Sequence, residues 1–464
     1  MEINITNKFN AKEEKCLKTL KVSWILAWSL LCDCCAKLIE YIKDIINSDD
    51  FIVHHKQKPS DFTRQRKLPF QTLIFFMMNL ISGSYQKELN NFFQTLMGFD
   101  IPQRFVSKVA LSKARLKLKY ETFVELNRHL VQYFYRHFES VSKWHGFNLL
   151  VVDGSLIRLP RIKKIAKHFG AWHPTKGDEC PMARASQLFD PLNRISVDAI
   201  LSPKHIGERE LAAQHFLKLL TEDLVLLDRG YPAYWLFNLI LSLNANFCAR
   251  ISNKKWKIVK KFFNSGKQET IISFPVFPTS INTCREMGLD LKPLKLRLIR
   301  INLPDGEAEI LITSLIDKEL YPYDIFAELY HQRWFVEEDY KKIKCWLEVE
   351  NFTGKTVLSV YQDFHVRVFS KNMTQILSLP TKPLIQQADR NRKYSYQVNF
   401  AQALASVKNT IVLLFNRPME TVYRLLSDLL ELLSITIEPI RPGRKFPRNP
   451  KKRKNFYLNY KPIG

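Results

Sequence analysis

Four side chains of chemically active types share one segment, Tyr330-His-Gln-Arg333-Trp-Phe-Val-Glu337-Glu-Asp-Tyr-Lys-Lys-Ile-Lys344. Tyr, Arg, Glu and Lys stand at positions i, i+3, i+7 and i+14 of this segment. At about 100° per residue these positions lie near 0°, −60°, −20° and −40° around a helix axis. The spacing therefore predicts a helix that presents all four side chains on one face.

Glu337 is the acidic residue of this segment that we assign to chemistry. The same arithmetic places Glu338 near about 80° and Asp339 near about 180°, so both point away from the shared face. An Arg333–Glu337 pair, four residues apart, is also common as a solvated ion pair on a helix surface. Taken alone, the segment fits a functional site and an ordinary charged helix face equally well.

Two more carboxylates follow strand-like aliphatic runs. Asp153 comes after Asn148-Leu-Leu-Val-Val and is followed by Gly-Ser, while Asp228 comes after Leu224-Val-Leu-Leu and is followed by Arg-Gly-Tyr. In an open α/β sheet, side chains at the carboxyl ends of neighbouring strands share a crevice, so two carboxylates there can hold a divalent cation. Each aspartate could also be only the first residue of a turn.

The composition favours a polyanionic partner. The chain has 464 residues, and its net charge is 70 − 45 = +25. Such an excess indicates nucleic acid first and an anionic membrane surface second. The apolar stretches are shorter than the roughly 18 to 20 residues that a membrane span needs, and we expect no span and no secretory signal. The eight cysteines are scattered, so we expect them to be reduced in a cytoplasmic protein.

Changes of pattern along the sequence divide the chain into regions. Strands alternate with helices in the middle of the chain, which predicts an α/β core flanked by helical regions. The predicted regions are a helical N-terminal module (1–55), a helical DNA-contacting region (56–145), the first part of the core (146–245), a β-rich insertion (246–320), the second part of the core with the glutamate helix (321–375), a helical C-terminal region (376–440) and a basic disordered tail (441–464).

A basic helix is predicted between residues 101 and 120. Lys108, Arg115 and Lys119 fall within about 60° of arc on this helix, so they form a stripe that could face DNA phosphates. The alternative is an ordinary solvated helix face in a chain that is basic throughout. The tail from residue 441 could add sequence-independent attraction to DNA or only aid solubility.

The order of these motifs resembles the DDE-type transposases of bacterial insertion sequences, in particular the insertion-sequence-four family. Asp153, Asp228 and then Y-(2)-R-(3)-E-(6)-K match the family's order and spacing. Asp228-Arg-Gly-Tyr231 is similar to its second-aspartate motif, and Arg333-Trp-Phe-Val-Glu337 is similar to its R-W-x-x-E motif. The resemblance extends over about residues 61 to 346.

The resemblance implies an RNase H-like catalytic core with a β-rich insertion, preceded and followed by helical regions. It implies that Asp153, Asp228 and Glu337 are catalytic and bind two Mg²⁺ ions, for which Mn²⁺ can substitute. Such a pair of ions serves both ends of an in-line displacement at phosphorus. The resemblance also implies that three residues of the glutamate helix contact DNA: Tyr330, Arg333 and Lys344.

The expected function is therefore that of a transposase. It would bind the terminal inverted repeats of an insertion sequence, cleave the ends by metal-dependent phosphodiester hydrolysis and transfer the strands to target DNA. A homodimer is expected in the synaptic complex, in a bacterial protein of the cytoplasm that associates with the nucleoid. Two alternatives remain open: an RNase H-like nuclease without strand transfer, and a domesticated DNA-binding protein without catalysis.

Overall fold

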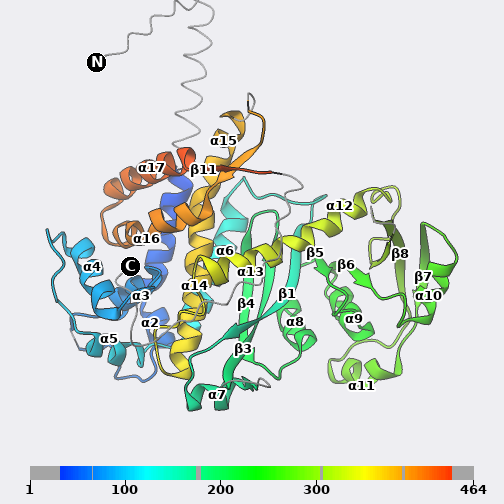
Figure 1. Ribbon diagram of the computed structural model, residues 1–464, viewed down its shortest axis with the longest axis horizontal. Coiled ribbons are helices and arrows are strands. Elements are labelled where there is room, and N and C mark those ends of the chain that lie inside the picture. The colour runs from blue at the N-terminus through cyan, green and yellow to red at the C-terminus, as the bar shows by residue number, and fades with distance from the viewer. Residues whose placement is uncertain (1–31, 65, 174–178, 304–306, 389–391, 442–464) are drawn as a thin grey trace, which may run out of the picture.

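The computed structural model describes residues 32–64, 66–173, 179–303, 307–388 and 392–441 (Figure 1). The predicted basic tail lies outside the described residues, except for residue 441, and so does most of the predicted N-terminal module. The described chain forms a helical body beside a mixed β-sheet (Figure 1). No helix of the described residues is long and apolar enough to cross a membrane.

The helical body combines the two ends of the described chain. Residues 32–47 are helical. The helices that follow before the sheet are α2 (Asp49–His55), α3 (Phe70–Met78), α4 (Tyr85–Met97), α5 (Lys108–Arg115) and α6 (Glu121–His137). Those after the sheet are α14 (Val357–Ser378), α15 (Lys382–Ala388), α16 (Phe400–Asn416) and α17 (Met419–Ile435), with a 3₁₀ turn at Leu379–Thr381. Two short strands, β10 (Tyr396–Val398) and β11 (Ile437–Pro439), pair with each other within a region predicted to be helical.

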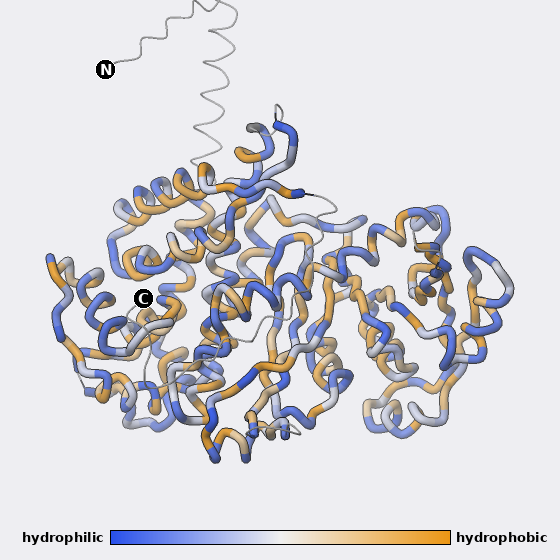
Figure 2. Tube along the Cα trace, in the orientation of Figure 1, coloured by the Kyte–Doolittle hydropathy of each residue, from blue (hydrophilic) through white to orange (hydrophobic). Residues whose placement is uncertain are grey.

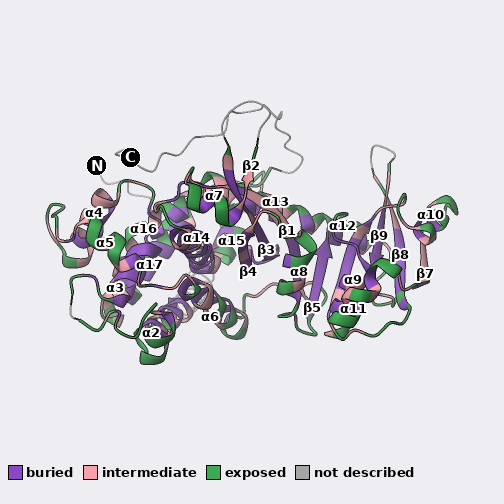
Figure 3. Cartoon of the chain, turned by 90° about the horizontal axis from the view of Figure 1, so that it is seen from below, coloured by how far each residue is buried: buried purple, intermediate pink, exposed green. Residues whose placement is uncertain are grey.

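Helix α14 is the central element of the body. It contacts α3, α6, α16 and strand β4 (Ile195–Pro203) and is buried on nearly all sides (Figure 3). A helix in such a position must satisfy its polar groups internally. Its first turn is fixed by Thr356, whose hydroxyl oxygen accepts a hydrogen bond from the backbone N–H of Ser359 at 3.0 Å. This hydrogen bond caps the helix and sets where it begins.

His365 in α14 gives the stability of the chain a pH dependence. The side chain is 5% exposed and its ring stacks on Tyr120. Burial lowers the pKa of His365 from 6.5 to about 4, and the nearby charges of Asp198 and Lys218 act in opposite directions. The unfolded chain binds a proton below pH of about 6.5, but the folded chain binds it only near pH 4, so stability should fall by up to about 3 kcal/mol between these values.

Urea unfolding of the wild type and of His365→Gln at pH 7 and at about pH 4.5 tests this prediction. Glutamine cannot be protonated, so the loss of stability on acidification should be smaller in the variant. Equal losses in both proteins would show that other groups cause the acid sensitivity.

The core sheet confirms the predicted RNase H-like α/β class. Its strands are β1 (Asn148–Arg158), β3 (Cys180–Asp190), β4, β5 (Asp223–Leu227) and β6 (Asn246–Ile251). They lie in the order β4-β3-β1-β5-β6. Strand β3 runs antiparallel to both of its neighbours, β1 and β4, whereas β5 and β6 run parallel to β1. Every residue of β5 is buried, as expected for a central strand covered on both faces.

Helices cover both faces of this sheet and complete two hydrophobic cores. The helical body packs on one face, while α8 (Glu208–Phe216) and α9 (Tyr234–Ser242) pack on the other. Figure 2 shows hydrophobic residues in both the body and the strands. The short helix α7 (Lys163–Phe169) and the strand β2 (Ala171–Trp172) lie beside β3.

The insertion extends the core sheet with further strands. Strands β7 (Glu269–Phe274), β8 (Leu294–Asn302) and β9 (Ala308–Thr313) continue it in the order β6-β9-β8-β7. Two helices that the sequence analysis did not predict, α10 (Lys257–Asn264) and α11 (Pro278–Glu286), cover these strands. Helix α10 spans only about two turns, but its apolar residues Ile258, Val259, Phe262 and Phe263 stand at helical spacing, a signal that the sequence analysis missed.

Candidate active site

Strands β1 and β5 bring Asp153 and Asp228 to neighbouring positions. The two strands pair in parallel as far as Val152 and Leu227, and an aspartate is the next residue on each strand. Strand β5 ends there, so Asp228 begins a turn as predicted. Strand β1 continues to Arg158 through its antiparallel pairing with β3.

The prediction that Asp153 ends its strand was therefore wrong. Asp153 lies within β1, opposite Gln187 of β3. The following Gly-Ser continues the strand and forms no turn, because β3 supplies hydrogen-bonding partners where β5 no longer does.

The carboxyl group of Asp153 has an unusual affinity for a proton. Burial raises its pKa to about 7, although the backbone N–H of Gly154 and the charge of Arg333 oppose the rise. The negative charges of Glu337 and Asp228 raise the pKa further. A cation bound beside Asp153 would favour its ionised form.

The predicted four-residue stripe lies on a nearly continuous helical segment. It comprises α12 (Ile325–His331), a 3₁₀ turn at Gln332–Trp334 and α13 (Phe335–Cys345). The guanidinium of Arg333 lies 3.3 Å from Glu337 Oε1, and its Nε lies 3.9 Å from Asp228 Oδ1. Arg333 is almost fully buried, so its positive charge is held between the two carboxylates.

Tyr330 and Lys344 dock the two ends of this segment onto the sheet. The hydroxyl of Tyr330 donates to the carbonyl oxygen of Leu227 at 3.3 Å, next to Asp228. The ammonium of Lys344 donates to Ser155 Oγ at 2.7 Å and to a backbone carbonyl of β1. Both side chains thus hold the glutamate helix in place in the DNA-free chain.

The other acidic residues of the segment point elsewhere, as the helical arithmetic indicates. Glu338 is half exposed and lies 3.6 Å from Arg194. Asp339 is 3% exposed, and both of its oxygens accept hydrogen bonds from the ammonium of Lys371 in α14 at 2.7 to 2.8 Å. Among the three consecutive acids, only Glu337 faces the two aspartates.

Tyr340 is a site residue that the sequence analysis missed. Its hydroxyl lies 3.0 Å from the carbonyl oxygen of Asp153 and 3.3 Å from that of Ala185, so it fixes the backbone of β1 at the aspartate. The signal was present in the sequence, because position 340 lies near about −80° on the same helical projection, beside Arg333. Its pKa is raised well above the ordinary value by burial, so the hydroxyl stays protonated and can donate.

Asp228 and Glu337 flank the guanidinium of Arg333 in this structure, and the charge of Arg333 also acts on Asp153. Among the described residues, no group of three or more His, Cys, Asp or Glu side chains is arranged to hold a metal ion. The chemistry of the set nevertheless fits Mg²⁺, because the donors of Asp153, Asp228 and Glu337 are all carboxylate oxygens. Arg333 already provides one positive charge at the place where these groups meet.

The predicted DNA-contacting stripe of residues 101–120 is only partly present. The helix is limited to α5, and Lys119 lies beyond it with its ammonium donating to the carbonyl oxygen of His54. Lys108 is exposed. Arg115 is 4% exposed and is paired with Asp363 of α14 at 2.8 Å. The assignment of Arg115 to DNA was therefore wrong, since the C-terminal end of α5, which carries it, lies against α14.

Comparison with known proteins identifies the family. Residues 144–373, which contain Asp153, Asp228 and Glu337, match the family model described as "Transposase DDE domain". The chain belongs to the DDE transposases. The transposase InsG for insertion sequence element IS4 of Escherichia coli (strain K12) is 22% identical over 399 residues, covering 84% of this DDE transposase and 87% of that protein. A solved synaptic complex of the piggyBac transposase with hairpin DNA has a TM-score of 0.43 at 8% identity, covering 91% of this chain and 86% of that one.

Proposed function

We propose that this DDE transposase performs cut-and-paste transposition. It binds the terminal inverted repeats of an insertion sequence, cleaves the element ends by metal-dependent phosphodiester hydrolysis and transfers the strands to target DNA. The observation that carries the proposal is that Arg333 lies 3.9 Å from Asp228 Oδ1 and 3.3 Å from Glu337 Oε1, while Asp153 and Asp228 each follow the last paired residue of the neighbouring strands β1 and β5. Residues from two neighbouring strands and one helix thus lie close enough to support a shared acidic site.

Asp153, Asp228 and Glu337 would hold two Mg²⁺ ions, with Mn²⁺ able to substitute. When bound, such ions activate the attacking water or 3′-hydroxyl and stabilise the leaving oxygen. Asp153 would have to be ionised to act as a ligand, and its raised pKa means that protons compete with the ion for this carboxylate. Tyr340 keeps the backbone of Asp153 in place.

Arg333 supplies positive charge beside Asp228 and Glu337, and Lys344 lies at Ser155, two residues after Asp153. We assign both to the phosphates nearest the cleaved bond, which they would contact in exchange for the protein partners that they hold in the DNA-free chain. A planar guanidinium and a compact ammonium both pair well with phosphate oxygens. Tyr330 is buried and its hydroxyl is already engaged, so its role is to position the helix. Lys108 and Lys119 remain proposed contacts to DNA flanking the site.

Double-stranded DNA, both element ends and target, is the proposed partner. Each element has two ends that must be held together during excision, which favours a homodimer in the synaptic complex. The proposed location is the bacterial cytoplasm, associated with the nucleoid, because the substrate is chromosomal DNA.

A transposition assay tests the proposed function. Purified full-length protein, Mg²⁺ and a linear fragment that carries the DNA flanking the gene should release the element and insert it into a second DNA. Cutting without joining would indicate the nuclease, and end binding without cutting would indicate the domesticated DNA-binding protein. Short inverted repeats bordered by direct duplications around the gene would be independent support.

Removal of divalent ions should stop cleavage, and Mg²⁺ or Mn²⁺ should restore it. Binding to the folded state also stabilises a protein by mass action, so saturating Mg²⁺ should raise the unfolding temperature of the wild type by a few degrees. The Asp153→Ala variant, which lacks a proposed ligand, should show a much smaller rise in a thermal-shift measurement. An equal rise in both proteins would place the ion elsewhere.

A further inference from the structure

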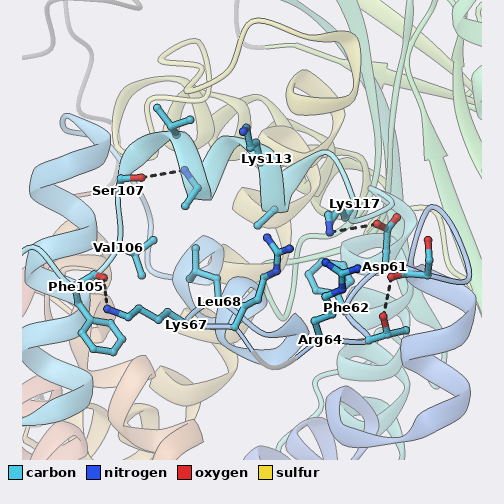
Figure 4. Close-up of a pocket in the computed structure, with 16 residues that line it drawn as sticks. Asp61, Phe62, Arg64, Lys67, Leu68, Phe105, Val106, Ser107, Lys113 and Lys117 are labelled. Atoms are coloured by element: carbon cyan, nitrogen blue, oxygen red, sulfur yellow. Dashed lines mark hydrogen bonds and ion pairs between the residues drawn. The ribbon is translucent and has the colours of Figure 1, made fainter.

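A basic hollow lies on the helical body, between residues 60–64 and 66–68 on one side and helix α5 on the other (Figure 4). Its volume is about 730 Å³. In Figure 1, α5 lies at the far side of the helical body from β5 and the insertion, so the hollow is separate from the acidic site. Its charged lining residues are Asp61, Arg64, Arg66, Lys67, Lys113 and Lys117. We call this hollow the basic groove.

The positive charges of the basic groove are largely uncompensated. Lys117 lies 3.5 Å from Asp61, the acidic residue of the lining. Within the described parts of the chain, Arg64, Arg66 and Lys113 are exposed and have no ion pair or hydrogen bond from their side chains. Three cations without partners around one concave surface create a local positive potential, which is a site for an anion.

The segment that precedes Arg64 is held in a defined conformation. Asp61 Oδ2 accepts a hydrogen bond from the backbone N–H of Lys58 at 3.1 Å, and Thr63 donates to the carbonyl oxygen of Ser60 at 3.0 Å. Phe62 has a φ of 58°, a left-handed conformation that costs energy for a bulky residue. Its ring packs edge-on against the ring of Phe70, with centroids 5.4 Å apart. These contacts fix the backbone next to Arg64 on one side of the basic groove.

The remaining lining of the basic groove combines three hydroxyl side chains with apolar ones. Leu68, Val106 and Ala110 are among the apolar residues, and the ammonium of Lys67 lies 4.3 Å from the ring centre of Phe105. A surface that combines cations with apolar side chains suits the DNA backbone, in which charged phosphates alternate with less polar deoxyribose. Arginine adds a planar fork that bonds two phosphate oxygens at once.

We infer that the basic groove binds the sugar–phosphate backbone of duplex DNA at a distance from the cleaved bond. This inference rests on the proposed function, because it names a second contact with the DNA on which the acidic site acts. Contacts to phosphates position a protein on DNA and carry no direct sequence information. The groove therefore contributes affinity and register, while the choice of element end lies with other residues.

The test compares two triple variants of the full-length protein that lose the same charge. Arg64→Ala/Arg66→Ala/Lys113→Ala removes the unpaired cations of the groove. The matched control replaces three exposed lysines of α10, at the opposite end of the molecule (Figure 1), by alanine: Lys257, Lys260 and Lys261.

Binding to a duplex that carries the element end is measured across a salt series. Each lost phosphate contact lowers the slope of log K against log salt by about 0.9, so the groove variant should have a slope shallower by roughly 2.7 and bind about 100-fold more weakly at low salt. The control should stay within about threefold of the wild type. Equal weakening by both triple variants, or an unchanged slope in the groove variant, would overturn the inference.

Different results would refute the inference about the basic groove and the proposed function. A wild-type protein that neither binds nor cuts element ends would refute the proposed function. A wild-type protein that cuts the ends, together with a groove variant that binds like it, would refute only the groove. The single charge reversal Lys113→Glu, at an exposed position of α5, checks the result without three simultaneous changes and should weaken binding by at least tenfold.

Discussion

Glu337→Ala should abolish DNA cleavage, whereas Glu338→Ala should leave it nearly unchanged. The two residues are adjacent in sequence, but Glu337 faces Arg333 and the aspartates, while Glu338 pairs with Arg194 at the surface. Loss of a group that acts directly on the reacting centre typically lowers the rate by about 10³-fold or more. A surface ion pair contributes at most about 1 kcal/mol to stability, so its loss should have little effect on folding.

The measurement is the rate of strand cleavage on a duplex that carries the element end, with binding to the same duplex as the control. Removing the negative charge of Glu337 should preserve or strengthen binding, because the DNA backbone is itself anionic. A Glu337→Ala protein that cuts at the wild-type rate would contradict the assignment of the site. Equal losses in both variants would point to a general effect on the helix.

The distinction between Glu337, Glu338 and Asp339 was predictable from the sequence because it depends on a local property. The angular positions of residues on one helix follow from the helical period alone. The same period holds across the short 3₁₀ turn at Gln332–Trp334 well enough to keep Arg333 in line with Glu337. The resemblance to the family, with its order Asp153, Asp228 and Glu337, then indicated that the glutamate helix lies beside the strands that precede the two aspartates.

Features that depend on a distant partner were not predictable in this way. The length of β1 beyond Asp153 is set by β3, which a reading of the aliphatic run alone cannot include. The burial of Arg115 likewise depends on a distant partner. Lys108 and Arg115 lie seven residues apart on the same stripe, but the end of α5 that carries Arg115 meets α14, whose contact residues are about 250 positions later in the chain.

Arg115→Met should lower the free energy of unfolding by about 3 to 5 kcal/mol. The guanidinium donates to Asp363 at 2.8 Å, to Gln362 at 3.0 Å and to Thr353 at 2.7 Å. Methionine retains much of the apolar volume but leaves the buried carboxylate of Asp363 without this partner. An uncompensated charge in the interior is among the largest single destabilising effects in proteins.

Urea unfolding measures this effect, with Lys108→Met as the matched control on the same helix. Lys108 is exposed, so its replacement should change stability by less than about 0.5 kcal/mol. The double variant Arg115→Met/Asp363→Asn removes both charges, and it should be less destabilised than the sum of the two single variants because no ionised group remains unpaired at this contact. If Arg115→Met instead kept its stability and weakened DNA binding, the arginine would be a DNA contact, and the packing of α5 on α14 could not be the reason for its presence.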